Sequence, residues 1–409
     1  MGPIAKSTIQ TSFVLGLRLL IQASTLLLVA RMLGPNEFGI FAGVAALAVL
    51  IGTFSTFGTH LVLLSEVSKD VTQHDRILRY AIPTTLITGS SLFCIFIIIC
   101  LLFFSNFNLP LQVIICIGLT ETIFLPLYLL STTEELALEK TARSQLLMIF
   151  PLGLRTLTAI FVMFIKPNEP LIIFSWLYLI SALFTLVCMK LYKPNAWLKP
   201  TVWRFAKKQE LKHSAGYATL ALTAAGPSEL DKMLAVKLLP LGISGVYVAA
   251  ARIMGAATLP IMALLLAALP RLFRSHVDVA KRSARLNLWI IISVLIYSVL
   301  ISIVLWWIAP WIELLFGPHY DGMTKLLHWF CYVIPLPLFR ISLTNILMSM
   351  NKPWLRAGIE SLGMVVLIFS AIIFYTYLDI LGIVLALAIS EMAMIISSSI
   401  LILKKYIKN

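Results

Sequence analysis

Long apolar stretches separated by short polar segments run through the whole chain. Twelve of them approach the roughly 20 residues that a helix needs to cross the hydrocarbon core of a bilayer. They are predicted at residues 12–33, 38–61, 81–104, 110–136, 145–165, 171–191, 215–236, 244–269, 286–308, 326–348, 355–377 and 381–403. The pattern predicts an all-α polytopic membrane protein with twelve transmembrane helices.

One short polar segment, Arg31–Phe41, is the only break in about fifty residues of apolar sequence between Ser12 and Leu64. It contains a Gly-Pro-Asn turn, so the first two helices are expected to form a tight hairpin. A related segment, Lys237–Tyr247, follows 206 residues later, which is half of the 409-residue chain.

A second pair of related segments supports a duplication. Leu125-Pro126-Leu127-Tyr128 matches Leu336-Pro337-Leu338-Phe339 at an offset of 211 residues. Both pairs relate span n to span n+6, and an even number of spans in each half predicts parallel repeats. We expect two six-helix lobes, with an N-lobe at 1–191, a basic cytoplasmic linker at 192–213 and a C-lobe at 214–409.

Composition requires lipid as the solvent. Hydrophobic residues make up 60% of the chain and charged residues 12%, and the mean hydropathy is +0.97; these values lie outside the range of soluble domains. No cleavable leader is expected, because Lys6 leads straight into a full-length helix. The five cysteines lie in apolar runs without metal-ligand spacing, so they are predicted to be packing residues.

The net charge of +14 is carried mostly by the short loops. With the N-terminus inside, the cytoplasmic segments hold 23 Lys and Arg residues and the external segments hold four. This asymmetry places both termini in the cytoplasm. In the linker, aromatic and apolar residues alternate with Lys and Arg, which is compatible either with a helix lying in the membrane interface or with a basic linker carrying aromatic anchors.

Charged residues also occur within the predicted spans. The basic ones are Arg18, Arg155, Lys232, Arg252 and Arg340, and the acidic ones include Glu121, Glu229, Asp231 and Glu391. A charge at the centre of a membrane helix costs about 2.5–3.5 kcal/mol on insertion scales, so these side chains are expected to face an internal hydrated cavity. A cavity rich in Arg and Lys favours anions, and Arg fits phosphate through its planar fork of donors.

Other roles for these charges stay open. Arg18 and Arg252 could extend to the interface or pair with carboxylates, and Asp231 and Lys232 could neutralise each other. Catalysis is not expected, because the chain has no P-loop and its six histidines lack metal-ligand spacing. No external loop is large enough for a catalytic domain, so the sequence favours a transporter over an enzyme.

Several motifs resemble those of a known family. The segment Arg31-x-Leu-Gly-Pro-x-Glu-Phe-Gly-Ile-Phe-Ala is similar to the signature of polysaccharide transporter proteins. These are the Wzx-type flippases for O-antigen and exopolysaccharide, in the multidrug/oligosaccharidyl-lipid/polysaccharide exporter superfamily. Asp231-Lys232, Leu315-Phe316-Gly317-Pro318-x-Tyr320 and Asn351-Lys352-Pro353 resemble further motifs of the family, in the same order along the chain.

The resemblance implies a flippase that moves undecaprenyl-pyrophosphate-linked oligosaccharide repeat units to the outer leaflet of the bacterial cytoplasmic membrane. It implies alternating access through a central basic cavity, with polysaccharide polymerase and glycosyltransferases as partners. Arg18, Lys232, Arg252, Arg340 and, more weakly, Arg155 are the expected anion-binding residues. Glu121, Glu229 and Asp231 are candidates for proton or Na⁺ coupling, although Asp231 could instead orient Lys232. We expect a monomer without cofactor or nucleic-acid partner.

Three alternatives compete with this hypothesis. An antiporter for drugs or organic cations in the same superfamily would need an acidic cavity, against the basic excess. A major-facilitator sugar transporter would carry a glycine- and arginine-rich loop between spans two and three, whereas Ser65–Arg76 contains no glycine. A scaffold subunit of a glycan-assembly complex would leave the intramembrane charges unexplained.

Overall fold

The computed structural model describes residues 3–104, 109–138, 140–192, 199–275, 280–349 and 353–408, and every regular element in these ranges is helical. Nine segments of this part of the chain are long and apolar enough to cross a membrane. Two of the nine each contain two predicted spans, and α8 (Lys208–Leu238), which is too polar to be among them, supplies the remaining one. The architecture therefore agrees with the twelve predicted spans.

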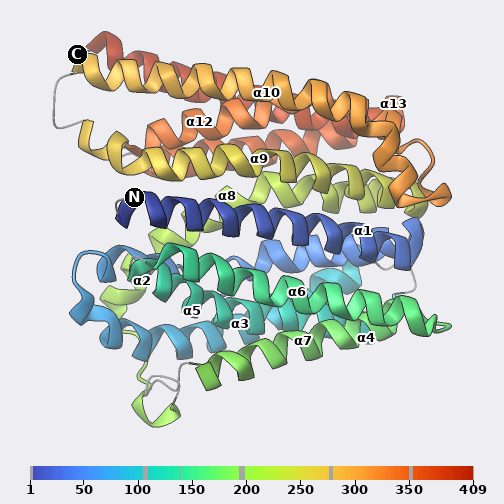
Figure 1. The fold of residues 1–409 in the computed structure, drawn as a ribbon, viewed down its shortest axis with the longest axis horizontal. Helices are drawn as coiled ribbons and strands as arrows, with labels where there is room; N and C mark the ends of the chain where they lie inside the picture. Colours follow the sequence, from blue (N-terminus) through green and yellow to red (C-terminus); the bar gives the residue numbers. More distant parts are fainter. Residues whose placement is uncertain are drawn as a thin grey trace. The chain divides into compact units, whose positions relative to one another are not determined.

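Helix α1 (Pro3–Gly52) contains the first span and most of the second. Its backbone leaves the helical region only at Gly34, where φ is 68° and ψ is 169°, and Pro35 begins the next helix. A positive φ is accessible to glycine without steric cost, and proline is favoured in the first turn of a helix. In Figure 1 the chain runs away from the N-terminus, reverses, and returns to α2, which lies on the same side of the picture as the N-terminus. The predicted hairpin is therefore present.

The second span is interrupted, which the sequence did not predict. After Gly52 the chain makes a series of turns and continues as α2 (Thr59–Val67). Phe57 and Gly58 both have positive φ, at 49° and 73°. A Cβ atom at Gly58 would collide with the backbone at Ser214, so only glycine allows this close approach to the start of α8.

The third and fourth spans pack against this interruption. The third is α3 (His74–Phe103), preceded by the short turn η1 (Val71–Gln73). The fourth consists of α4 (Leu111–Leu119), one π-helical segment η3 (Thr120–Phe124) and α5 (Leu125–Ala137). Gly52 and Gly89 lie directly against the η3 carbonyl groups of Glu121 and Thr122. Because a side chain at either glycine would push the backbones apart, these positions set the packing distance.

The fifth and sixth spans are α6 (Thr141–Ile165) and α7 (Pro170–Tyr192), followed by the linker. Residues 193–198, including Trp197 and Leu198, lie outside the described residues. In the described remainder of the linker, residues 199–207 form the turn η5 (Pro200–Val202) and an extended segment, and residues 208–213 belong to α8. The Arg204 amide donates to the Arg79 carbonyl at 3.0 Å, and Trp203 packs on the apolar cluster around Leu63, so the linker is attached to the N-terminal lobe.

Residue contacts divide the chain into two units. Unit 1 comprises residues 1–33 and 40–225, and unit 2 comprises 34–39 and 226–409. The sequence placed the start of the second lobe at 214, whereas the division lies within α8, between Ala225 and Gly226. The physical reason is that the first turns of α8 pack on the interrupted second span at Gly58, and that the Tyr217 hydroxyl lies 3.4 Å from that of Ser65.

Unit 2 continues with five further helices. These are α9 (Leu241–Ser275), α10 (Ala280–Phe316), α11 (Met323–Val333), α12 (Pro335–Ser349) and α13 (Pro353–Lys408), with the turn η6 (Pro318–Tyr320) before α11. Of the five, α9, α10 and α12 run side by side in Figure 1. Helix α13 contains the last two spans and leaves the helical region at Asp379, where φ is 48°. Gly382 then lies against the Phe374 carbonyl, so the chain reverses there.

Each of the related sequence segments lies at a helix start or a helix break. The segment Gly34–Gly39 packs on the first turn of α9 at Leu241–Gly245, and a Cβ atom at Gly39 would lie 2.9 Å from the Leu241 carbonyl oxygen. The second pair follows η3 before Leu125 and the break before Pro335. The duplication itself stays a prediction from the sequence. The Asn351-Lys352 turn lies outside the described residues.

Candidate functional site

Arg18 lies in unit 1 on α1 and reaches α6. Its Nη1 donates to the Gln145 side-chain oxygen at 2.8 Å and contacts the Met148 sulfur at 3.3 Å. No carboxylate among the described residues forms an ion pair with it. The positive charge of Arg18 is therefore solvated by a neutral amide and a thioether and stays available to an anion.

Arg155 lies on α6 two turns beyond Met148, on the same face of the helix. Its guanidinium carbon is 5.1 Å from the centre of the Phe41 ring and 4.7 Å from that of Tyr178. The Tyr178 hydroxyl donates to the Glu121 carboxylate. Aromatic faces stabilise a cation without neutralising its charge. Arg155 is thus, like Arg18, a predicted anion-binding residue of unit 1 without a carboxylate in ion-pair contact among the described residues.

Lys232 and Asp231 lie in unit 2 on α8 and are both buried. The Lys232 ammonium is 3.2 Å from Asp231 Oδ1 and also donates to the Ser228 carbonyl. The local neutralisation left open by the sequence is therefore present. Both of these contacts of the Lys232 ammonium, to Asp231 and to the Ser228 carbonyl, are thus within α8.

Arg252 on α9 pairs with Glu229 on α8, also in unit 2. The closest nitrogen–oxygen distance is 3.2 Å, and the Arg252 side chain is about a third exposed. The pairing of Arg252 with a carboxylate, one of the sequence alternatives, is thus observed. Because the pair is partly solvated, a ligand of unit 2 can reach Arg252 more readily than Lys232.

Arg340 on α12 lies in a buried cluster of four charged side chains. Its Nε is 2.6 Å from Glu391, its Nη1 is 4.0 Å from Glu360, and Arg356 Nε is 2.9 Å from the same Glu360 oxygen. The two basic and two acidic groups balance each other. A buried cluster of this kind joins α12 to both halves of α13, because each charge would be costly to leave alone.

The five predicted basic residues therefore separate into two groups. The three in unit 2, Lys232, Arg252 and Arg340, each face a carboxylate, whereas Arg18 and Arg155 in unit 1 are held by neutral or aromatic groups. In the described part of the chain, the uncompensated positive charge within the spans belongs to unit 1.

Several participants were missed from the sequence. Gln145 gave no pattern beyond being an amide in an apolar helix. Phe41, the last aromatic residue of the Arg31 motif, was seen as a family marker and not as a partner of Arg155. Arg356 was assigned to a loop, although its spacing of four residues from Glu360 on one helix could have indicated the pair.

The three coupling candidates are also placed. Glu121 lies in the π-helical segment η3 and accepts from Tyr178, while Glu229 and Asp231 take part in the unit 2 pairs. Single π-turns within helices are frequent at functional sites, which draws attention to Glu121. Among the residues that the structure describes, no group of three or more His, Cys, Asp or Glu side chains could hold a metal ion.

No family model matches the sequence, and no curated protein matches it. Solved structures do match the fold over almost the whole chain. The outward-facing conformation of a multidrug resistance MATE family transporter of the MOP superfamily has a TM-score of 0.68 at 14% identity, over 97% of this chain and 94% of that one. MATE in the straight conformation gives 0.67 at 13% identity, over 98% and 96%.

A third structure is described by the reverse polarity of its binding pocket, which suggests a different function for a MOP superfamily transporter from Pyrococcus furiosus Vc1. It has a TM-score of 0.65 at 14% identity and covers 97% of this chain and 95% of that one. The chain therefore has the fold of MATE-like transporters of this superfamily. Together with its apolar helices, this fold identifies a multi-pass membrane protein.

Proposed function

We propose that this protein is a flippase for polyprenyl-pyrophosphate-linked oligosaccharides used in surface polysaccharide synthesis. The fold supports a membrane transporter, and transport would proceed by alternating access. Arg18 would bind the phosphate groups during transport, with Arg155 deeper along α6. Cytoplasmic placement of both termini rests on the loop charges and stays a prediction, as does the bacterial cytoplasmic membrane as the location.

The observation that carries the proposal is the unpaired charge of Arg18. Among the described residues, the Arg18 guanidinium contacts the Gln145 amide and the Met148 sulfur and no carboxylate, although a charge within a membrane span calls for a counterion. A phosphate can supply that counterion through charge-assisted hydrogen bonds, for which the planar guanidinium is well suited. The phosphate of the substrate would thus neutralise the positive charge of Arg18.

The runner-up is an antiporter for organic cations, which the MATE-like fold accommodates equally well. A cation needs a carboxylate that is not already engaged by a basic group. Glu229, Asp231 and Glu391 each lie against a basic side chain. Glu121 accepts a hydrogen bond from Tyr178, whose ring faces Arg155. The arrangement of charges therefore favours an anionic substrate, and the pocket of reversed polarity in the Pyrococcus furiosus protein is a precedent for such differences within one fold.

The proposal is tested by translocation in proteoliposomes. Purified protein would be reconstituted with a fluorescent lipid-linked oligosaccharide, and its transfer between leaflets would be followed by quenching from outside. We expect wild-type protein to translocate it, Arg18→Ala to lose at least tenfold in rate, and Arg18→Lys to retain part of the activity because the charge remains. Arg143→Ala is the matched control, since Arg143 lies near the start of the same helix α6 and stacks on Tyr192.

Two results would contradict the proposal. Equal rates for wild-type and Arg18→Ala protein, at equal reconstitution, would remove Arg18 from substrate binding. Efflux of ethidium by the wild-type protein, without transfer of the lipid-linked oligosaccharide, would establish the cation antiporter instead.

A further inference from the structure

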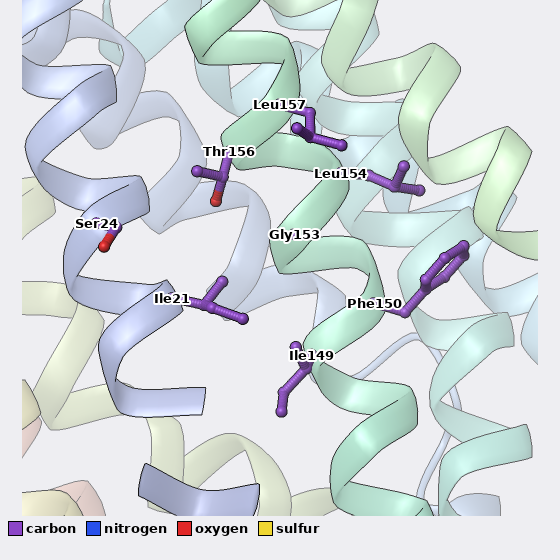
Figure 2. A pocket seen from close by; sticks show the side chains of 8 residues that line it. All are labelled: Ile21, Ser24, Ile149, Phe150, Gly153, Leu154, Thr156 and Leu157. Carbon is purple, nitrogen blue, oxygen red and sulfur yellow. The ribbon is translucent and has the colours of Figure 1, made fainter. Parts of the chain in front are cut away.

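A groove of about 490 Å³ lies between α1 and α6 in unit 1. Figure 2 shows Ile21 and Ser24 on α1 and the remaining lining residues on α6, with Ile21 and Thr156 pointing into the space between the helices. Apart from Ser24, Thr156 and Gly153, the lining is hydrocarbon: Ile21, Ile149, Phe150, Leu154 and Leu157. The groove is thus suited to an apolar chain.

The groove is open to the outside of the helix pair. Leu157 is 61% exposed and Phe150 is 38% exposed. Gly153 lies between them along α6, and a Cβ atom there would meet nothing within 4 Å. The missing side chain leaves the floor of the groove uncovered, so a chain from the surrounding lipid can lie against it.

Polar contacts between α1 and α6 mark both ends of the groove. At one end Arg18 donates to Gln145, one turn before Ile21 on α1 and one turn before Ile149 on α6. At the other end the hydroxyls of Thr25 and Thr156 lie 2.6 Å apart. The separation of eleven positions between Gln145 and Thr156 corresponds to about 16 Å of helix, roughly half of the ~30 Å hydrocarbon core.

We infer that this groove holds the first part of the hydrocarbon chain of the carrier lipid while Arg18 holds its phosphate. The inference rests on the proposed function and specifies where the lipid part of the substrate binds. An apolar groove that ends at a guanidinium without a carboxylate partner in the described part of the chain matches a molecule with one anionic end and one long apolar chain. The Arg18 charge and the groove then act as one site for an anionic polyprenyl lipid.

Competition between lipids distinguishes this occupant from an ordinary phospholipid. Arg18 lies six residues inside the predicted span 12–33, whereas Gln145, which it contacts, is the first residue of the predicted span 145–165. The phosphate of a bulk phospholipid is therefore within reach of Arg18, and selectivity for the carrier lipid has to be measured.

Photolabelling tests the inference. The full chain in lipid nanodiscs would be labelled with a polyprenyl phosphate that carries a diazirine in its second isoprene unit, and labelled residues would be mapped by mass spectrometry. The variants are Gly153→Trp, which fills the groove, and Arg18→Ala. The matched control is Gly358→Trp, because a Cβ atom at Gly358 in unit 2 would also meet nothing within 4 Å.

We expect the label on α1 and α6 within residues 21–24 and 149–157, reduced at least tenfold in both variants and unchanged in the control. Unlabelled polyprenyl phosphate should compete, whereas uncharged polyprenol and phosphatidylglycerol at the same concentration should not. Equal competition by either of the latter would show a non-selective lipid crevice and overturn the inference. Wild-type labelling of Gly153→Trp would overturn it as well.

The translocation assay separates this inference from the proposed function. If wild-type protein translocates lipid-linked oligosaccharide but the label lies on other helices, the groove is wrong and the proposed function stands. If wild-type protein translocates none, the proposed function fails whatever the labelling shows.

Discussion

Replacing Gly39 by alanine tests whether the two repeated turns pack as closely as the structure shows. A Cβ atom at Gly39 would lie 2.9 Å from both the Leu241 carbonyl oxygen and the Ser244 hydroxyl, and 3.0 Å from the Gly245 nitrogen. Ordinary contacts begin at 3.4 Å, so neighbouring atoms, two of them backbone, must move by about 0.5 Å. Overpacking of this kind typically costs about 1–3 kcal/mol.

The matched control is Gly255→Ala on α9. A Cβ atom at Gly255 would meet nothing within 4 Å, so alanine there should only gain helix propensity, at most about 1 kcal/mol. For a unit of this size, 1 kcal/mol corresponds to about 2–4 °C in melting temperature. We therefore expect Gly39→Ala to melt several degrees below wild type and Gly255→Ala to melt at or slightly above it.

The assay is thermal unfolding in detergent, followed with a dye that reacts with thiols as they become exposed. Cys331 is buried in α11 of unit 2 and reports on the unit that contains the Gly39 turn. Equal melting temperatures for Gly39→Ala and Gly255→Ala, with similar expression, would refute the close packing of the two turns.

Two further predictions concern the ion pairs. Arg340→Ala should cost about 3–5 kcal/mol of stability because it leaves Glu391 buried without its partner. Arg252→Ala should cost about 1 kcal/mol or less, because its ion pair with Glu229 is partly exposed. Equal melting temperatures for the two variants would contradict this. Two hydrogen bonds from Arg204 hold the pKa of Glu210 below its usual value. The contribution of these hydrogen bonds to stability is therefore complete above about pH 5. It is lost as the pH falls through the lowered pKa. The melting temperature of wild-type protein should therefore fall more steeply on acidification than that of Glu210→Gln, and parallel curves would show that Glu210 does not contribute.

The fold could be predicted because the membrane imposes it. In a bilayer the backbone N–H and C=O groups must form their hydrogen bonds within each helix. The length of each apolar span was therefore enough to predict a helix. The interruption at Phe57 and Gly58 could not be predicted in this way, because residues 38–61 are apolar enough to form one helix. It depends on contact with Ser214, which is more than 150 residues distant in the sequence.

The candidate site was only partly predictable. Composition identified Arg18 and Arg155 as charges inside the membrane, and the same reasoning identified Arg340. Sequence spacing did not reveal that Arg340 has Glu391 as a partner at 2.6 Å whereas Arg18 has Gln145. Such partners come from other helices, so charge compensation depends on helix packing and not on the order of residues.

The sequence by itself determined that this is a helical membrane protein of twelve spans, with a duplicated pattern and basic residues in both halves. These properties follow from the hydropathy of each segment and from motifs within single segments. Only the tertiary structure decided which basic residues are neutralised and which are not. It also placed Arg18 at the end of a groove lined by Ile21 and Ile149. The reason is that both properties depend on which helix faces meet, those of α12 and α13 at Arg340 and those of α1 and α6 at Arg18, and helix periodicity leaves these pairings open.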